Sequence, residues 1–349
     1  MATRKLKKFL ILLDDESLLY FPGSFLSGKV LLELEESTPA IGLYFHIIGE
    51  GVVNLSDKGR IIQTDKENYI DFRMRLLGEG ETKSDIGSTA NGSVASNRVL
   101  ILSPGVHTFP FKLGLPLGLP STFLGKHGWV QYYCKAVLKD PHNVLHKNQQ
   151  VFIVMNPIDL NLEPTLLTQP FHCEVEDKIG INCITRGLVS CRVRLDRGGY
   201  VPGESIKIYA HIENNSKVTI KKTKAILTET IQYTAKNKLA HSESRELASI
   251  ERGKIVPKAS DQWRGELLYI PPLPPTNLRG CHLIKIQYDV YFIVDGKGSK
   301  PIKLQLPIML ATYPLRNKDG TLSRRKGTHY PSTLPISRPW LDGEKKLKP

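Results

Sequence analysis

The stretch Tyr20-Phe21-Pro22-Gly23-Ser24 has the composition of a turn, and an alternating segment, 25–34, follows it. Proline presets the backbone for the first corner of a turn, and glycine accepts the positive φ that the next corner often needs. Alternation of apolar and polar residues with a period of two is typical of a half-buried antiparallel strand. The stretch therefore predicts a tight turn that leads into a core strand.

The same pattern returns in the second half of the chain, at Tyr200-Val201-Pro202-Gly203-Glu204. In the segment that follows, 206–213, the apolar residues share one face: Ile206, Ile208, Ala210 and Ile212. The opposite face carries Lys207, Tyr209, His211 and Glu213. A repeat of this kind indicates one β module used twice.

A second repeat supports the duplication. A Leu-Pro turn at 119–125 precedes the strand-like run 129–138, and a Leu-Pro turn at 273–280 precedes the run 283–292. Each copy also has a proline-led turn upstream of this pair. Because three landmarks recur in one order, we interpret the chain as a duplicated β domain.

The length of 349 residues fits two domains better than one. We expect a first domain at 1–154, a linker at 155–177 and a second domain at 178–315. The remaining segment, 316–349, is basic and proline-containing with few apolar side chains, which predicts a short disordered tail.

Many short strands separated by Pro/Gly turns indicate an all-β fold of sandwiches or barrels. The only helical candidate is 243–249, where a loop fits equally well. The segment 77–97 is rich in Gly, Ser, Thr and Asn and is predicted to be a long mobile loop. A hairpin turn is predicted at 295–298.

The chain carries a formal net charge of +14, which attracts phosphate groups of nucleic acid or anionic lipid. It has no nucleic-acid-binding motif, so anionic lipid or a phosphorylated tail is the expected anionic partner and nucleic acid is not. The alternative is that the lysines are solvated residues that protect strand edges from pairing. The candidate contact residues are Lys5, Lys7, Lys8, Lys217, Lys221, Lys222 and Lys224.

No apolar run approaches the roughly 20 residues of a membrane span. The N-terminal segment lacks the features of a signal peptide, so we expect a cytoplasmic protein. The five cysteines are odd in number and show no Cys-x-x-Cys spacing, which predicts reduced thiols. We expect neither a metal site nor a cofactor.

The opening turn also nearly matches a phosphate-binding loop, at 23–30. Val30 replaces the hydroxyl residue that such a loop needs, and a strand follows where a helix should begin. The second copy keeps only the Pro-Gly pair, so Pro22, Gly23, Pro202 and Gly203 are predicted to be structural turn residues.

No other pattern assembles an active site. The sequence contains no Gly-x-Ser-x-Gly motif and no histidine pair at metal-binding spacing, so we predict no catalytic residues and no enzyme. Pro271-Pro272-Leu273-Pro274 matches a ligand of WW domains, although a rigid connector between strands is the simpler interpretation.

Taken together, the landmarks resemble those of the arrestin family, and most closely its alpha-arrestin (arrestin domain-containing) branch. They occur in family order over residues 6–315. Besides the opening turn, the matching segments are 103–111, 119–128, 157–161, 199–204, 213–216, 270–278 and 288–290.

The resemblance implies two tandem immunoglobulin-like β-sandwiches joined by a short linker. It also implies a non-enzymatic cytoplasmic adaptor, peripheral at the plasma membrane or endosomes. Such an adaptor binds the cytoplasmic tails of membrane-protein cargo and assists its endocytosis, sorting or ubiquitin-dependent degradation.

Many alpha-arrestins recruit ubiquitin ligases through a C-terminal Pro-Pro-x-Tyr motif, which this sequence lacks, so the ligase stays open. Two alternatives to the cargo adaptor remain. One is a retromer-like scaffold for soluble trafficking or signalling complexes, and the other is a β-sandwich that binds a small ligand.

Overall fold

The computed structural model describes residues 6–57, 60–78, 99–142, 145–179, 187–237, 239–298 and 300–316. Strands make up nearly all of its regular structure, and the single helical element in this part of the chain is a short 3-10 turn, Thr165–Thr168. The all-β prediction is therefore confirmed. No helix among the described residues has the length and hydropathy of a membrane span.

The chain divides into two compact units. The first consists of Met1–Val52, Lys66–Leu124 and Trp129–Asn156. The second consists of Pro157–Pro349 with two short insertions, Val53–Asp65 and Gly125–Gly128.

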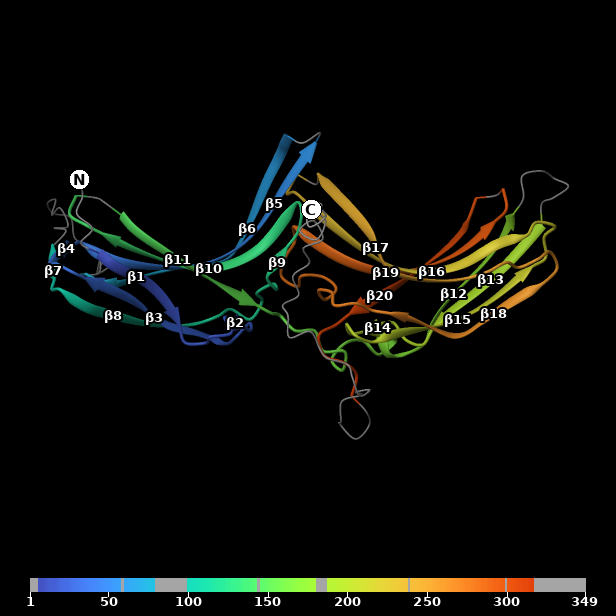
Figure 1. Ribbon diagram of the computed structural model, residues 1–349, viewed down its shortest axis with the longest axis horizontal. Coiled ribbons are helices and arrows are strands. Elements are labelled where there is room, and N and C mark those ends of the chain that lie inside the picture. The colour runs from blue at the N-terminus through green and yellow to red at the C-terminus, as the bar shows by residue number, and fades with distance from the viewer. Residues whose placement is uncertain are drawn as a thin grey trace, which may run out of the picture. The chain divides into compact units, whose positions relative to one another are not determined.

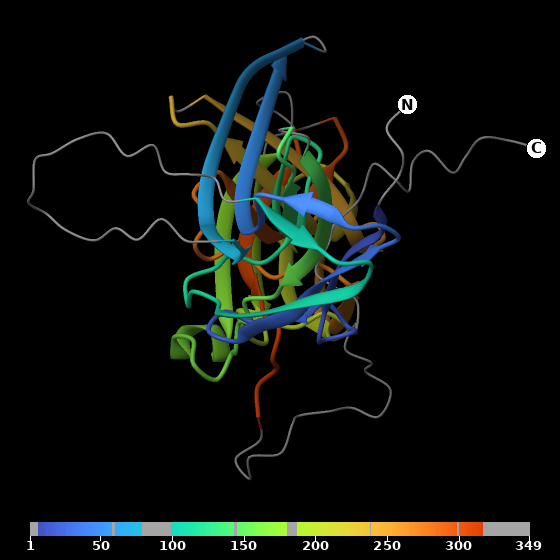
Figure 2. The ribbon, with the colours of Figure 1, turned by 90° about the vertical axis from the view of Figure 1, so that its left-hand side faces the viewer.

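The first unit is built from a three-stranded sheet and a larger sheet, which Figures 1 and 2 show in blue to green. The three-stranded sheet has the order β1 (Leu6–Leu13), β3 (Phe25–Leu34), β8 (Gly105–Gly114). The larger sheet has the order β2 (Leu19–Tyr20), β11 (Leu145–Val154), β10 (Gly128–Lys139), β5 (Gly42–Asp57), β6 (Arg60–Leu77), with β9 (Phe123–Leu124) paired to β10. A small separate pair joins β4 (Thr38–Ala40) and β7 (Leu100–Leu102).

The core of the first unit lies between these sheets. Alternate residues of β3 are buried, and the rings of Phe45 and Phe111 meet at a centroid distance of 4.1 Å. Gly23 has a φ of +80°, and its N–H donates to the carbonyl of Leu115 at 3.1 Å. The predicted turn therefore fastens the start of β3 to the end of β8.

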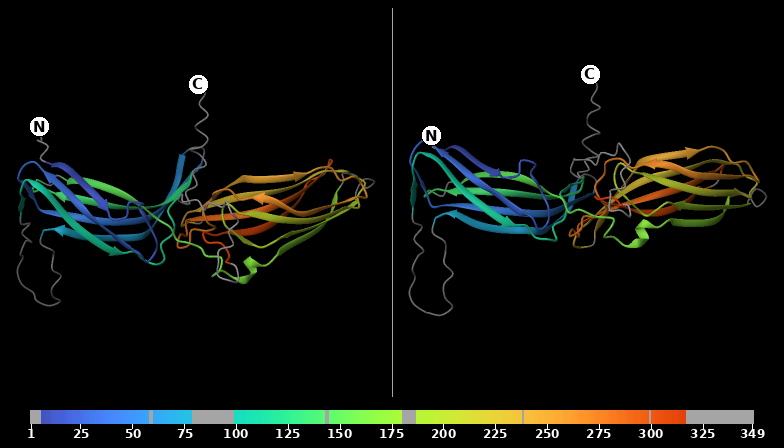
Figure 3. Two further views of the ribbon diagram at one scale, coloured as in Figure 1. Left: turned by 60° about the horizontal axis from the view of Figure 1, so that its bottom comes forward. Right: turned by 90° about the horizontal axis from the view of Figure 1, so that it is seen from below.

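The second unit is also a two-layered sandwich, drawn in yellow-green to red in Figure 3. One sheet has the order β12 (Phe171–Ile179), β13 (Gly187–Leu195), β15 (Ser205–Asn214), β18 (Ser260–Tyr269). The other has the order β14 (Gly199–Tyr200), β20 (Ile302–Leu310), β19 (Ile284–Gly296), β16 (Ile220–Thr234), β17 (Ala240–Arg252).

The turn that opens the chain is reproduced in the second unit. Gly203 has a φ of +88°, and its N–H donates to the carbonyl of Ile270 at 2.9 Å. The strand that follows, β15, buries alternate residues as the sequence predicts. The Pro-Gly pair thus forms the same corner in both sandwiches.

The duplicated Leu-Pro turns also have a common anchor. In the first unit the hydroxyl of Tyr132 lies 2.6 Å from the carbonyl oxygen of Pro120. In the second unit the hydroxyl of Tyr288 lies 2.8 Å from the carbonyl oxygen of Pro274. Each turn is therefore held to the core strand that follows it in sequence.

Part of the segment expected as a linker, 155–177, is built into the second unit. Ile158 and Leu160 are buried with Val201 and Ala311, and the carbonyl of Ile158 accepts a hydrogen bond from the N–H of Thr312 at 2.8 Å. Farther along, β12 begins at Phe171.

Two local expectations have different outcomes. The helix or loop expected at 243–249 is wrong, because these residues belong to β17 and pair with β16. Pairing with β16, the strand that precedes it, overrides the local preference of this charged segment. The hairpin turn at 295–298 is confirmed between β19 and β20. Most of the loop expected at 77–97, and all of the tail beyond Arg316, lie outside the described residues.

Candidate functional site

The lysines near the first strand are engaged in ion pairs. The ammonium groups of Lys7 and Lys8 lie 2.7 Å and 3.2 Å from the carboxylate of Glu33 on β3. Hydrogen bonds from both lysines hold the pKa of Glu33 below its usual value. Lys5 lies outside the described residues. Exposed pairs of this kind contribute little to stability, so both lysines can exchange Glu33 for another anion.

The lysines of β16 are also partly paired. Lys222 contacts Glu251 at 3.0 Å and Lys224 contacts Glu246 at 2.8 Å, both across to β17. The hydrogen bond with Glu251 raises the pKa of Lys222. Lys217 and Lys221 are exposed, and no carboxylate of the described residues pairs with either. The structure therefore brings Lys222 and Lys224 together on one strand face, while Lys221 is the extra residue of a register shift between Ile220 and Lys222.

The proline-rich candidate for WW domains is buried in its second half. Leu273 and Pro274 are buried, and the carbonyl of Pro274 receives the hydroxyl of Tyr288. Recognition of a polyproline II segment needs its prolines to dock on an aromatic groove of the partner. The geometry favours the alternative interpretation, a rigid connector between strands.

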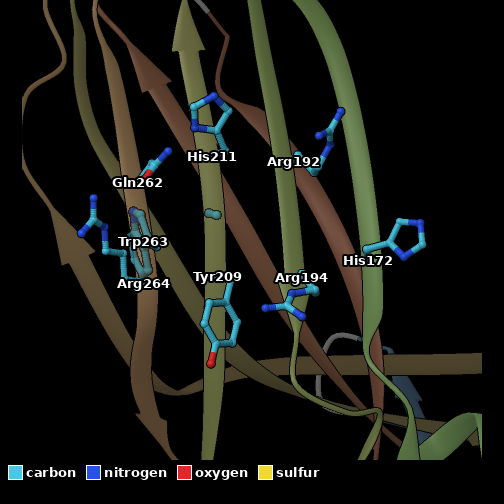
Figure 4. Close-up of a pocket in the computed structure, with 9 residues that line it drawn as sticks. His172, Arg192, Arg194, Tyr209, His211, Gln262, Trp263 and Arg264 are labelled. Atoms are coloured by element: carbon cyan, nitrogen blue, oxygen red, sulfur yellow. The ribbon is translucent and has the colours of Figure 1, made fainter.

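A further surface lies on the solvent-facing side of the β12-β13-β15-β18 sheet, and the sequence alone does not single it out. It forms an open concavity of about 500 Å³ (Figure 4). We call it the arginine face. Its outward-facing residues are the exposed His172, Arg192, Arg194, Gln262 and Arg264 and the half-buried Tyr209 and His211.

Strand register explains why these residues meet. Arg194 on β13 lies opposite Tyr209 on β15, and Tyr209 lies opposite Arg264 on β18. The neighbouring row, in the same order of strands, is Arg192, His211 and Gln262. Residues two apart on a strand point to the same side, so both rows face solvent together.

Tyr209 occupies the centre of the face. The guanidinium of Arg194 lies 4.3 Å from the centroid of its ring, within the range of a cation–π interaction. On the other side, Gly265 forms a bulge with a φ of +102°, and a Cβ at this position would lie 3.3 Å from the ring. The missing side chain gives the tyrosine room to lie along the sheet.

The charges of the face are only partly neutralised. Arg192 pairs with Glu174 at 2.8 Å, and His211 pairs with Glu213 at 2.9 Å. Among the described residues no carboxylate pairs with Arg194 or Arg264. Unpaired guanidinium groups are donors of planar, charge-assisted hydrogen bonds to carboxylate and phosphate. The arginine face is therefore able to bind an anion.

One sequence signal could have indicated this surface. Arg192 and Arg194 alternate with apolar residues, as do Tyr209 and His211, so each pair is expected on a solvent-facing strand side. Which strands lie next to each other depends on non-local pairing. The sequence pattern does not contain that information.

Comparison with protein families gives two matches in tandem. Residues 9–161 match the model of "Arrestin (or S-antigen), N-terminal domain", and residues 185–315 match that of "Arrestin (or S-antigen), C-terminal domain". The matches follow the order of the landmarks found in the sequence, and they confirm the resemblance drawn from them.

Individual relatives agree with the family models. The chain is 30% identical to mouse "Arrestin domain-containing protein 4" over 322 residues, covering 89% of this chain and 73% of the relative. It is 29% identical to the human protein of that name over 321 residues, covering 87% and 71%. It is 28% identical to mouse "Thioredoxin-interacting protein" over 343 residues, covering 97% and 80%.

Proposed function

The chain belongs to the arrestin family, in its arrestin domain-containing branch, and from this premise we propose that it is a non-enzymatic adaptor for membrane-protein cargo. Proteins of this family generally act by binding other proteins. The adaptor would bind cytoplasmic tails of membrane proteins and assist their endocytosis, sorting or ubiquitin-dependent degradation.

The observation that carries the proposal is the pair of consecutive arrestin domains, matched over most of the chain. The character of the surface supports it, since arginine and lysine side chains gather on exposed strand faces of a chain with a net charge of +14. Cationic strand faces suit acidic protein segments better than they suit an uncharged substrate.

The proposal includes a place in the cell and a second type of contact. The protein would be cytoplasmic and peripheral at the plasma membrane or endosomes. Anionic lipid would be contacted by the lysines named from the sequence, Lys5, Lys7, Lys8, Lys217, Lys221, Lys222 and Lys224. Cargo ubiquitination would need a route to a ligase other than a Pro-Pro-x-Tyr motif in this sequence.

Proximity labelling in cells tests the proposal. The full-length chain should label transporters, receptors or endosomal proteins above a control in which the labelling enzyme is expressed alone. A parallel sample lacking residues 316–349 separates a role of the tail from that of the two domains. Labelling confined to soluble proteins in both samples would overturn the cargo role.

A second candidate is a scaffold for soluble partners, as in a retromer-like or signalling complex. It is favoured by one observation: a relative similar over nearly all of this chain bears the name "Thioredoxin-interacting protein", which describes an interaction with another protein. Stable co-purification of a soluble partner at a fixed stoichiometry, without enrichment of membrane proteins, would favour this scaffold over the cargo adaptor.

A further inference from the structure

The arginine face contains two guanidinium groups that lack a carboxylate partner among the described residues. The strands of the whole second sandwich, β12 to β20, carry five arginines, and three of them pair with an acidic side chain: Arg192, Arg245 and Arg252. The remaining two, Arg194 and Arg264, lie on either side of Tyr209 in one row. The unneutralised arginines of this sandwich are therefore concentrated on one surface.

The spacing of these groups indicates the size of the ligand. Arg194 and Arg264 are two strands apart, which places their backbones about 10 Å from each other. In Figure 4 the Arg194 side chain leans toward Tyr209, whereas that of Arg264 lies apart from it on the far strand. Because the two groups do not converge, a single phosphate would contact one of them and leave the other unpaired.

An extended peptide matches the spacing better. Alternate side chains of an extended chain lie on the same side about 7 Å apart, whereas side chains three residues apart point to opposite sides. The distance of about 7 Å corresponds to Arg192 and Arg194 along β13. Flexible glutamate and arginine side chains can span the larger distance of about 10 Å between Arg194 and Arg264 across the sheet. The ring of Tyr209 offers an apolar surface between the charges, over which a peptide backbone can pass.

The acidic residues of the face decide between a peptide and a membrane. Glu174 and Glu213 are interspersed with the cations and are exposed. A continuous layer of anionic headgroups would meet these carboxylates and be repelled by them. A peptide can place its charges on the arginines and leave uncharged residues opposite the glutamates.

We propose that the arginine face binds an extended acidic peptide, with carboxylates on Arg194 and Arg264 and the peptide backbone across Tyr209. The identification of this peptide as a cytoplasmic segment of a membrane protein rests on the proposed adaptor function. The binding chemistry itself does not depend on that function.

Fluorescence anisotropy with the full-length chain tests the binding. The probe is a labelled peptide of about twelve residues with glutamate at every second position. Its counterpart has glutamine at the same positions. The glutamate peptide should bind, and its affinity should fall as salt is raised, because the contacts are between exposed charges. The glutamine peptide should bind at least about tenfold more weakly.

The double variant Arg194→Glu/Arg264→Glu should bind the glutamate peptide with an affinity lower by about tenfold or more. A matched control is Lys303→Glu/Lys285→Glu, which makes the same charge change on exposed residues of the other sheet. Lys303 lies 3.7 Å from the Tyr291 ring centroid, so this control also removes a cation–π contact. It should bind like the unaltered chain, and both variants should melt within a few degrees of it.

If both double variants lose peptide affinity equally, the effect comes from net charge alone and the inference is wrong. Unchanged peptide binding in the Arg194/Arg264 variant would also overturn it. If the glutamate peptide does not bind but vesicles containing phosphatidylserine do, and Arg194→Glu/Arg264→Glu releases the vesicles, the face is a membrane surface and the peptide proposal is wrong.

Proximity labelling with the same variants separates this inference from the adaptor function. Loss of membrane-protein labelling in the Arg194/Arg264 variant alone supports the face as the cargo site. Unchanged labelling refutes that assignment and leaves the adaptor function intact. Absence of membrane proteins with the unaltered chain refutes the adaptor function, and the anisotropy experiment still decides whether the face binds acidic peptides.

Discussion

Arg245 on β17 donates a hydrogen bond of 2.5 Å to the buried carboxylate of Glu229 on β16. The first sandwich has the equivalent pair at the same sequence separation, Lys66 on β6 with Glu50 on β5. Each carboxylate also has a second polar neighbour from the strand on its other side, β19 or β10. The internal duplication therefore extends to an ion pair with a buried carboxylate, which no turn motif indicates.

Removing the cation of this pair should destabilise the second sandwich. Arg245→Met leaves the Glu229 carboxylate, which is 1% exposed, without its charged donor. Because Arg245 itself is partly solvated, we expect a loss of about 2–3 kcal/mol in the free energy of unfolding, toward the lower end for a broken buried pair. Chemical denaturation followed by circular dichroism measures it.

Arg252→Met is the matched control, since Arg252 lies on the same strand and its ion pairs with Asp261 and Glu266 are open to solvent. It should cost less than about 1 kcal/mol. An Arg245 variant as stable as the Arg252 variant would mean that water replaces the lost donor at Glu229.

The two Pro-Gly corners should depend on glycine for stability alone. Gly23→Ala and Gly203→Ala each place a side chain at a positive φ, for which we expect a loss of about 1–2 kcal/mol in unfolding free energy. Gly118→Ala is the control, because a Cβ there has no neighbour within 4 Å and its φ is not positive. Melting temperatures that fall as much in the control as in the corner variants would contradict this view.

The sequence predicts the corners well because their conformation is local. Pro22-Gly23 and Pro202-Gly203 specify a turn through their own backbone preferences, and the alternating residues after them specify a half-buried strand. The segment 243–249 fails for the complementary reason. Its strand conformation in β17 comes from hydrogen bonds to β16, and those pairings are not encoded within the segment.

The binding residues are harder to predict than the fold, because their state depends on neighbours across the sheet. Lys222 appears as a free cation in the sequence, yet strand pairing brings it to Glu251. Arg194 and Arg264 are far apart in the chain, and only the register of three strands places them around Tyr209. Charge composition indicates that cations are plentiful but not which of them remain unpaired.

The folded protein should not present its proline-rich segment to WW domains. Pro274 is buried and its carbonyl oxygen receives the Tyr288 hydroxyl, so the segment cannot leave the core without breaking that contact. A synthetic peptide covering 268–278 should bind an isolated WW domain more tightly than the folded chain does, as measured by calorimetry. Equal affinity for both would show that this connector opens in solution.

The same comparison applies to the C-terminal segment. Residues 316–349 contain no Pro-Pro-x-Tyr motif, so a peptide of that sequence should not bind WW domains of ubiquitin ligases. A peptide carrying an added Pro-Pro-x-Tyr serves as the positive control. Micromolar binding by the unaltered sequence would show that ligase recruitment uses a different determinant within it.

Thiol reactivity should divide the cysteines by their burial. Burial raises the pKa of Cys134 and of Cys191 to about 12, so at pH 8 both remain neutral thiols and poor nucleophiles. Cys173 and Cys281 are half-buried.

Brief treatment with iodoacetamide at pH 8, followed by mass spectrometry, should modify Cys173 and Cys281 well before Cys134 and Cys191. The order should vanish in denaturant, where Cys134 and Cys191 lose their burial and regain ordinary thiol pKa values. The pKa of each of these two thiols is higher in the folded protein than in the unfolded chain, so the neutral thiols contribute to stability below the unfolded-state pKa. That contribution is lost as the pH rises toward 12. Equal labelling of all four sites in the native protein would mean that the two cores open on the timescale of the reaction.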